Sequence, residues 1–225
     1  MSKENLQGIY SWLKTEPLPK MVDEALRFYG VKNNYNDANN PITRTWGTRL
    51  GVDVREFYEC NSYRNFNDNE MIEYANSESM SGARSLFGQN LKIVTEGHFV
   101  PWCGLFMGFV AKESGKKEVD QPCWPINWKN FGVEVDAPML GDVLIFIRLS
   151  ENRKKAGSLG LYIGEDKDCY HVLGGNQDEK VCITRILKSR LYAARRPEYK
   201  EVPKCVQKIS LPSNCTLVQK YAMCM

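Results

Sequence analysis

The sequence predicts an α+β protein, with helices in its first half and an antiparallel β-sheet in its second half. Apolar residues at positions 103, 106, 107 and 110 follow the i, i+3, i+4, i+7 spacing of an amphipathic helix. After position 142, short apolar runs rich in β-branched residues alternate with turns that contain Gly. This alternation is typical of successive strands joined by short loops.

Three helices are expected ahead of the sheet. Residues 5–14 and 17–30 have the composition of short helices, and the second of these has an apolar face. The third helix follows Pro101, begins at or near Cys103, and ends at Gly115. A thiol at a helix N-terminus lies beside free backbone N–H groups and the positive end of the helix dipole, which favour a nucleophilic thiolate.

The second half predicts a meander of short strands, in which each strand lies beside the one before it. The first strand follows the turn at Gly141 and Asp142. The strands are expected at 143–147, 157–164, 169–173, 181–184 and 191–195.

Length and composition exclude several classes of protein. A net charge of +3 with scattered basic residues argues against a nucleic-acid-binding surface. No apolar run is long enough to span a membrane, and the polar N-terminus lacks a signal peptide, so we expect synthesis in the cytoplasm. Eight cysteines without a Cys-x-x-Cys motif, and only two histidines, predict no metal site, and we expect no cofactor.

Composition divides the chain into four parts. Residues 1–33 are expected to supply N-terminal helices of the core, and residues 96–198 the Cys103 helix and the sheet. Residues 34–95 are polar and have weak periodicity, which indicates an insertion or subdomain. Residues 199–225 have two prolines and three cysteines and predict a C-terminal arm. We expect the insertion and the arm to contact a protein partner or peptidoglycan.

Several motifs, in order along residues 100–197, resemble the papain-like peptidases of the NlpC/P60 and CHAP type. The resemblance is closest to a group of phage and bacterial cell-wall hydrolases in that class. The matching segments are Pro101-Trp102-Cys103, Trp128, Pro138 to Asp142, Leu173 to Gln177, Lys188 to Leu191, and Arg195-Arg196-Pro197. The resemblance implies a papain-like core in which N-terminal helices pack on a small antiparallel sheet, and an ancestral activity on peptidoglycan.

The chemistry of that family requires a cysteine nucleophile, a histidine base on the facing strand, and a polar residue that orients the histidine. The resemblance makes Cys103 the nucleophile, but Ser158 occupies the position of the histidine. A serine hydroxyl does not accept a proton near neutral pH, and loss of the histidine lowers the rate on the order of 10⁴–10⁶-fold. His171 is then either the orienting residue without its partner or a substitute base, and Asn176 either orients a base or binds substrate.

Each of these residues also has a structural interpretation. Cys103 at an apolar helical position is compatible with a small core residue. Trp102 and Trp128 either flank a substrate cleft or pack in the core. Gln177 either binds the substrate backbone or belongs to a turn. Two further residues, Glu96 and His98, precede the cysteine and are expected in a cleft wall and a surface loop.

Two functions remain open at this point, and the missing histidine favours the first. The first is a degenerate, phage-related peptidoglycan hydrolase with reduced or absent catalysis and a structural, wall-binding or protein-binding role. The second is an active cysteine amidase or endopeptidase, an endolysin or virion-associated lysin, which uses Cys103 with a rewired base. A third explanation is a laboratory substitution at Ser158 in an active enzyme. Without a signal peptide, we expect the protein in a virion or released by phage lysis.

Overall fold

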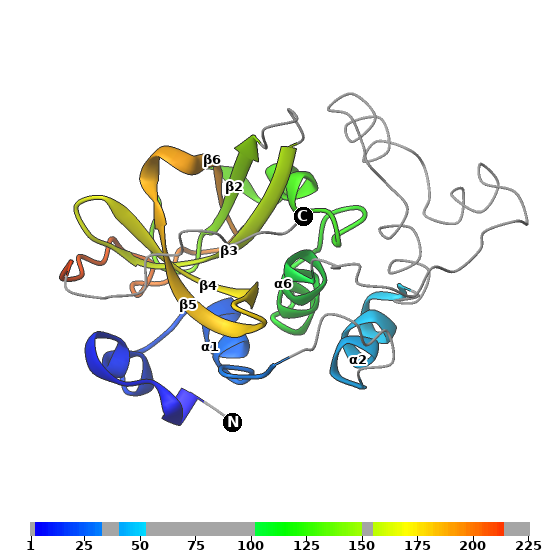
Figure 1. The fold of residues 1–225 in the computed structure, drawn as a ribbon, viewed down its shortest axis with the longest axis horizontal. Coiled ribbons are helices and arrows are strands. Elements are labelled where there is room, and N and C mark those ends of the chain that lie inside the picture. Colours follow the sequence, from blue (N-terminus) through cyan, green and yellow to red (C-terminus); the bar gives the residue numbers. More distant parts are fainter. Residues whose placement is uncertain (1–2, 33–40, 53–101, 150–154, 214–225) are drawn as a thin grey trace, which may run out of the picture.

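Helices pack against an antiparallel sheet, which confirms the α+β class (Figure 1). The structure is a computed structural model and describes residues 3–32, 41–52, 102–149 and 155–213. The helical elements before the sheet are η1 (Lys3–Asn5), η2 (Gly8–Lys14), α1 (Lys20–Leu26), α2 (Pro41–Leu50) and α6 (Cys103–Glu113).

The first two segments differ from the continuous helix predicted over 5–14. Both are 3-10 helices, and Gly8, the first residue of η2, has a φ of +60°. A left-handed residue at this point interrupts an α-helix. The prediction over 17–30 is confirmed in its centre, because α1 begins after Pro19 and ends before Gly30, where φ is +83°.

Helix α6 begins at Cys103, as the sequence predicts, and Gly115 follows its end with a φ of +70°. Every residue from Cys103 to Ala111 is buried, so the helix is covered on more sides than its apolar stripe indicated. Helix α2 covers one of these sides through Trp46, and the centroids of the Trp46 and Phe106 rings are 5.1 Å apart. Thr43, Trp46 and Gly47 of this helix are therefore buried, whereas residues 34–40 and 53–95 of the predicted insertion lie outside the described residues.

Six strands form one sheet in the order β1-β6-β2-β3-β4-β5. Their bounds are β1 (Val133–Glu134), β2 (Val143–Leu149), β3 (Lys155–Glu165), β4 (Cys169–Gln177), β5 (Lys180–Leu187) and β6 (Leu191–Arg196). The two-residue strand β1 was not predicted, and β4 continues four residues past its predicted end. Two further 3-10 helices, η3 (Pro125–Asn130) and η4 (Lys188–Arg190), lie in the connections.

The predicted meander is correct for β2 to β5 and wrong for β6, which pairs with β2 instead of β5. The chain that follows α1 pairs with the first residues of β5 at its outer edge. Gly30 N–H donates to the Val181 carbonyl at 2.8 Å, and Val181 N–H donates to the Val31 carbonyl at 2.9 Å. The strand β6 pairs with β2 on the other side of the sheet.

This connection requires a curled sheet. In a flat sheet, β5 and β6 would be four strand spacings apart, or about 19 Å. Only three residues, those of η4, separate Leu187 at the end of β5 from Leu191 at the start of β6. The Cα atoms of Leu187 and Leu191 are therefore at most about 14 Å apart. The sheet therefore curls, and its strands cross steeply in Figure 1.

Curling produces two apolar clusters, one on each face of the sheet. The main cluster contains Cys103 and the helices, together with Ile145, Leu159 and Leu161 from the strands. The second cluster lies on the other face and contains residues of five strands: Leu144, Phe146, Tyr162, Tyr170, Val172, Ile186 and Ala194. Side chains alternate between the two faces along each strand, as β geometry requires.

The described part of the predicted C-terminal arm, residues 199–213, packs on the core. Glu165 N–H donates to the Ile209 carbonyl, and Leu211 N–H donates to the Glu165 carbonyl, both at 2.8 Å. Val206 is buried, and the Gln207 carbonyl accepts from Leu140 N–H at 2.9 Å. The arm thus extends the sheet beside the end of β3.

Candidate functional site

Two of the motifs that carry the family resemblance meet at the start of α6. Gly175 lies so close to Trp102 and Phe106 that a Cβ on it would be 2.7 Å from the Trp102 ring and 2.8 Å from the Phe106 Cβ. The Leu-Gly-Gly-Asn-Gln segment of β4 therefore packs directly against the turn that carries Cys103. Only glycine permits this approach, which explains the residue type at position 175.

The Cys103 side chain is in the core, with 1% of the residue exposed. The first turn of α6 packs on the loop that contains Cys123, because a Cβ on Gly104 would overlap the carbonyl oxygens of Pro122 and Cys123. Burial, together with the neighbouring Cys103 thiol, raises the pKa of Cys123 to about 12. Cys123, which the sequence did not single out, is therefore a protonated thiol at neutral pH and supplies no base.

Ser158 lies on the sheet face opposite to Cys103. It pairs with Phe146 of β2, and Phe146 belongs to the second cluster, whereas the adjacent Leu159 belongs to the main cluster with Cys103. The Ser158 hydroxyl oxygen is buried and has no hydrogen-bond partner among the described residues. The structure therefore does not bring Ser158 to the thiol.

His171 is on the same face as Cys103 but at a distance from it. The contact between β4 and the start of α6 is at Gly175, four residues further along the strand. With a rise of about 3.3 Å per residue, His171 is roughly 13 Å away from this contact along β4. It is fully buried, and both of its ring nitrogens are engaged by other side chains.

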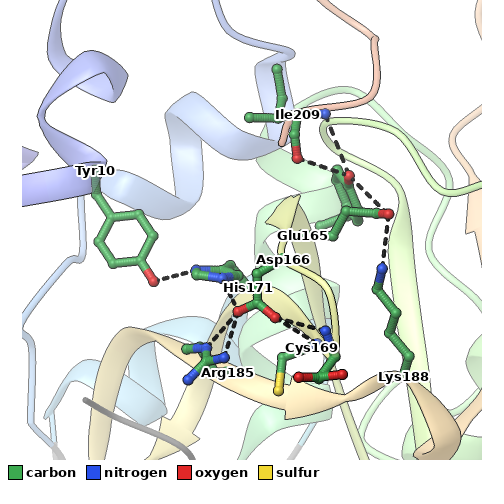
Figure 2. A network of polar contacts seen from close by, with 10 residues as sticks. Tyr10, Glu165, Asp166, Cys169, His171, Arg185, Lys188 and Ile209 are labelled. Atoms are coloured by element: carbon green, nitrogen blue, oxygen red, sulfur yellow. Dashed lines mark hydrogen bonds and ion pairs between the residues drawn. The ribbon is translucent and has the colours of Figure 1, made fainter. Parts of the chain in front are cut away.

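Those two contacts define the protonation of the ring (Figure 2). Nε2 lies 3.0 Å from a carboxylate oxygen of Asp166, and Nδ1 lies 2.6 Å from the hydroxyl of Tyr10. An ionised carboxylate only accepts hydrogen bonds, so Nε2 carries the proton, and Nδ1 accepts from the tyrosine. Burial lowers the pKa of His171, and the hydrogen bond to Asp166 partly opposes this effect. The imidazole is neutral, and its basic nitrogen is covered.

Asp166 is the centre of this network. One carboxylate oxygen accepts from backbone N–H groups of Asp168 and Cys169, both at 2.9 Å. The other accepts from Arg185, whose Nη2 is at 2.6 Å and whose Nε is at 2.7 Å, and from His171. Burial alone would raise the pKa of Asp166, but these hydrogen bonds outweigh it and hold the value at about 2. No local sequence pattern marks Tyr10, Asp166 and Arg185 as partners in this network, because they meet only through folding.

The remaining predicted polar residues are used inside the fold. The Gln177 amide donates to the Val172 carbonyl at 3.2 Å, and its oxygen accepts from the Thr184 hydroxyl. Asn176 is 4% exposed and has a φ of +59°, a left-handed conformation that asparagine tolerates. Of the predicted site residues, Asn176 is next in sequence to the contact between Gly175 and α6, and it is therefore near the start of the helix.

The two tryptophans proposed for substrate binding are fully buried. The Trp102 ring lies 5.6 Å from that of Trp46, and Trp128 donates its indole N–H to the Pro122 carbonyl at 2.8 Å. Both side chains are therefore core residues and do not form a cleft surface. Glu96 and His98 lie outside the described residues.

Two further motifs of the resemblance form a structural pair. Asp142 is fully buried at the start of β2 and accepts two hydrogen bonds from Arg196 of β6, at 2.9 and 2.8 Å. It also accepts from the backbone N–H of Met139 at 2.8 Å. The Gly-Asp and Arg-Arg-Pro motifs therefore hold β6 in place beside β2.

Several further properties bear on the class of site. Within the described ranges, no group of three or more His, Cys, Asp or Glu side chains is arranged to hold a metal ion. Among the described helices, none has the length and apolar character needed to cross a membrane. In the same part of the chain, no disulfide joins Cys103, Cys123, Cys169, Cys182 or Cys205 to one another.

Comparisons with protein-family models, with curated proteins and with solved structures found no match to this chain. The likeness to papain-like hydrolases therefore rests on the sequence motifs alone.

Proposed function

We propose that this protein is a catalytically silent, papain-like relative of phage-type peptidoglycan hydrolases, and that it binds a cell-wall or protein partner without cleaving it. One observation carries the proposal: His171, the histidine within the described residues, is sequestered. Its basic nitrogen accepts from Tyr10, and its other nitrogen donates to Asp166. An imidazole held in this way does not accept a proton from Cys103.

The surroundings of Cys103 support the same conclusion. Nucleophilic catalysis requires a base within hydrogen-bond reach of the thiol and an accessible sulfur. Cys103 is 1% exposed, and its neighbour Cys123 has a pKa raised to about 12. Ser158, at the position where the family has its base, is on the other face of the sheet.

Other motifs of the resemblance nevertheless make contacts that build the fold. The Asp142–Arg196 pair joins β2 to β6, and Gly175 allows β4 to contact α6. A fold with these contacts and with His171 held by Tyr10 and Asp166 fits a role in binding or assembly. We propose peptidoglycan as the first ligand to test because the resemblance is to cell-wall hydrolases.

The test is to incubate the purified protein with bacterial sacculi and to measure release of soluble muropeptides and cosedimentation in the same samples. We expect no release from the wild-type protein, and equal sedimentation of wild type and Cys103→Ala. Release that Cys103→Ala abolishes would show that the protein is an active cysteine hydrolase. Absence of sedimentation would exclude the wall as the ligand and leave a protein partner.

The variant Ser158→His places a histidine at the position where the resemblance implies the catalytic base. We expect it to release no muropeptides, because its imidazole would enter the second apolar cluster beside Phe146. A gain of hydrolysis that requires Cys103 would show instead that position 158 faces the thiol, and the assigned face of β3 would be wrong.

A further inference from the structure

The hydrogen bond between Tyr10 and His171 joins residues 161 positions apart. Tyr10 belongs to η2, and His171 is the third residue of β4 (Figure 2). Both residues are buried, Tyr10 at 8% exposed and His171 at 0%. The contact therefore attaches the N-terminal segment to the sheet through a polar interaction inside an otherwise apolar interface, which also contains Leu6 and Leu13.

The state of this bond depends on one proton. In the neutral ring, Nδ1 has a lone pair and accepts from the Tyr10 hydroxyl. When the ring is protonated, Nδ1 carries a hydrogen, so the Tyr10 hydroxyl no longer donates to it and is left only as a neutral acceptor for a buried cation. The new cation is then buried beside the Arg185 guanidinium, and both share the single negative charge of Asp166.

The ionisable groups that face the ring come from three places: Tyr10 from η2, Asp166 from the turn between β3 and β4, and Arg185 from β5. The charged groups of the other elements packed on β4 are directed elsewhere. Lys20 and Asp23 of α1 are exposed. The pairs that these elements form among the described residues are Glu24 with Arg27, Lys112 with Glu118, Arg49 with Glu113, Lys180 with Asp178, and Glu165 with Lys188 and Lys208.

We propose that Tyr10 and His171 form a proton-sensitive latch, which holds η2 on the sheet at neutral pH and releases it as the pH falls. Release exposes the ring of His171 to water, so the open state binds a proton at the ordinary pH for histidine, and the closed state resists it. With one proton taken up on opening, the population of the open state rises up to about tenfold for each pH unit below about 6.5. This inference does not depend on the proposed function.

Hydrogen exchange of the full-length protein tests the latch between pH 7 and pH 5, after correction for the intrinsic exchange rate. We expect opening of residues 8–14 to increase by roughly tenfold per pH unit in acid, at labelling times when amides of β2 and β3 remain protected. If residues 8–14 and the sheet lose protection together, acid acts through global unfolding and the latch is wrong. A pH-independent opening of residues 8–14 would also overturn it.

His171→Gln is the decisive variant, because its amide can accept from Tyr10 and donate to Asp166 but does not titrate. We expect the pH dependence of opening in residues 8–14 to disappear in this variant and to persist in the control, His98→Gln. If pH dependence persists in His171→Gln, another group is responsible.

Tyr10→Phe keeps the ring and removes the hydroxyl, and it remains informative if His171→Gln does not fold. We expect it to raise opening of residues 8–14 at pH 7 by fivefold or more, while β2 and β3 remain protected. Unchanged opening in this variant would show that the hydroxyl does not hold the segment.

Discussion

Asp166→Ala is expected to lower the free energy of unfolding by about 3–5 kcal/mol. The side chain of Asp166 is fully buried, and that of Arg185 is 9% exposed. Removal of the carboxylate leaves the guanidinium without its counter-ion and the Nε2–H of His171 without its acceptor. Removing one partner of a buried ion pair costs more than exchanging the whole pair, because the remaining charge stays desolvated.

Chemical denaturation at pH 7 measures this effect. The matched control is Asp168→Ala, which removes an exposed carboxylate two residues away and is expected to change stability by about 0.5 kcal/mol or less. In a double-mutant cycle, Arg185→Met should recover part of the loss caused by Asp166→Ala. Equal effects of the Asp166 and Asp168 variants would show that the buried network contributes nothing specific.

Because its pKa is lowered in the folded protein, Asp166 also makes the free energy of unfolding decrease in acid. Hydrogen bonds hold the pKa of Asp166 at about 2 in the folded protein, below its ordinary 3.8. A lowered pKa stabilises the folded state above the ordinary value, and this contribution is lost as the pH falls through the folded value. The wild-type protein is therefore expected to lose roughly 2 kcal/mol more than Asp166→Ala between pH 5 and pH 2.

Asp142→Ala is expected to lower the free energy of unfolding by about 3 kcal/mol. It would remove both hydrogen bonds to Arg196 and the acceptor for Met139 N–H, and it would leave a partly buried guanidinium. The side chain of Arg196 is 17% exposed, so some hydration of the remaining charge limits the loss.

The neighbouring ion pair between Arg195 and Glu134 provides the comparison. Glu134 is 78% exposed, and Glu134→Ala is expected to cost about 0.5 kcal/mol or less. In Asp142→Ala, hydrogen exchange should show the largest loss of amide protection at β6, because the Asp142–Arg196 pair joins this strand to β2. A loss as small as that of Glu134→Ala would contradict the structural role assigned to the two motifs.

Prediction from sequence succeeded where local patterns determine structure. The start of α6 at Cys103 follows from apolar spacing and flanking residues, and strands β2 to β5 follow from runs of β-branched residues between turns. The predicted position of β6 was wrong, because β6 pairs with β2, a strand more than 40 residues earlier in the chain, and not with its sequence neighbour β5. Pairing of this kind depends on the curl of the whole sheet, which no short segment of sequence determines.

The candidate site also has features that local sequence determines and features that only the tertiary structure decides. The sequence by itself determined the α+β class, the helix that begins at Cys103, and the serine at position 158, because these depend on residue types and short spacings. Only the tertiary structure decided the environment of each side chain. It places Ser158 on the opposite sheet face from Cys103 and surrounds His171 with Tyr10 and Asp166. Accessibility and protonation depend on contacts between residues far apart in the chain, and local sequence carries no record of those contacts.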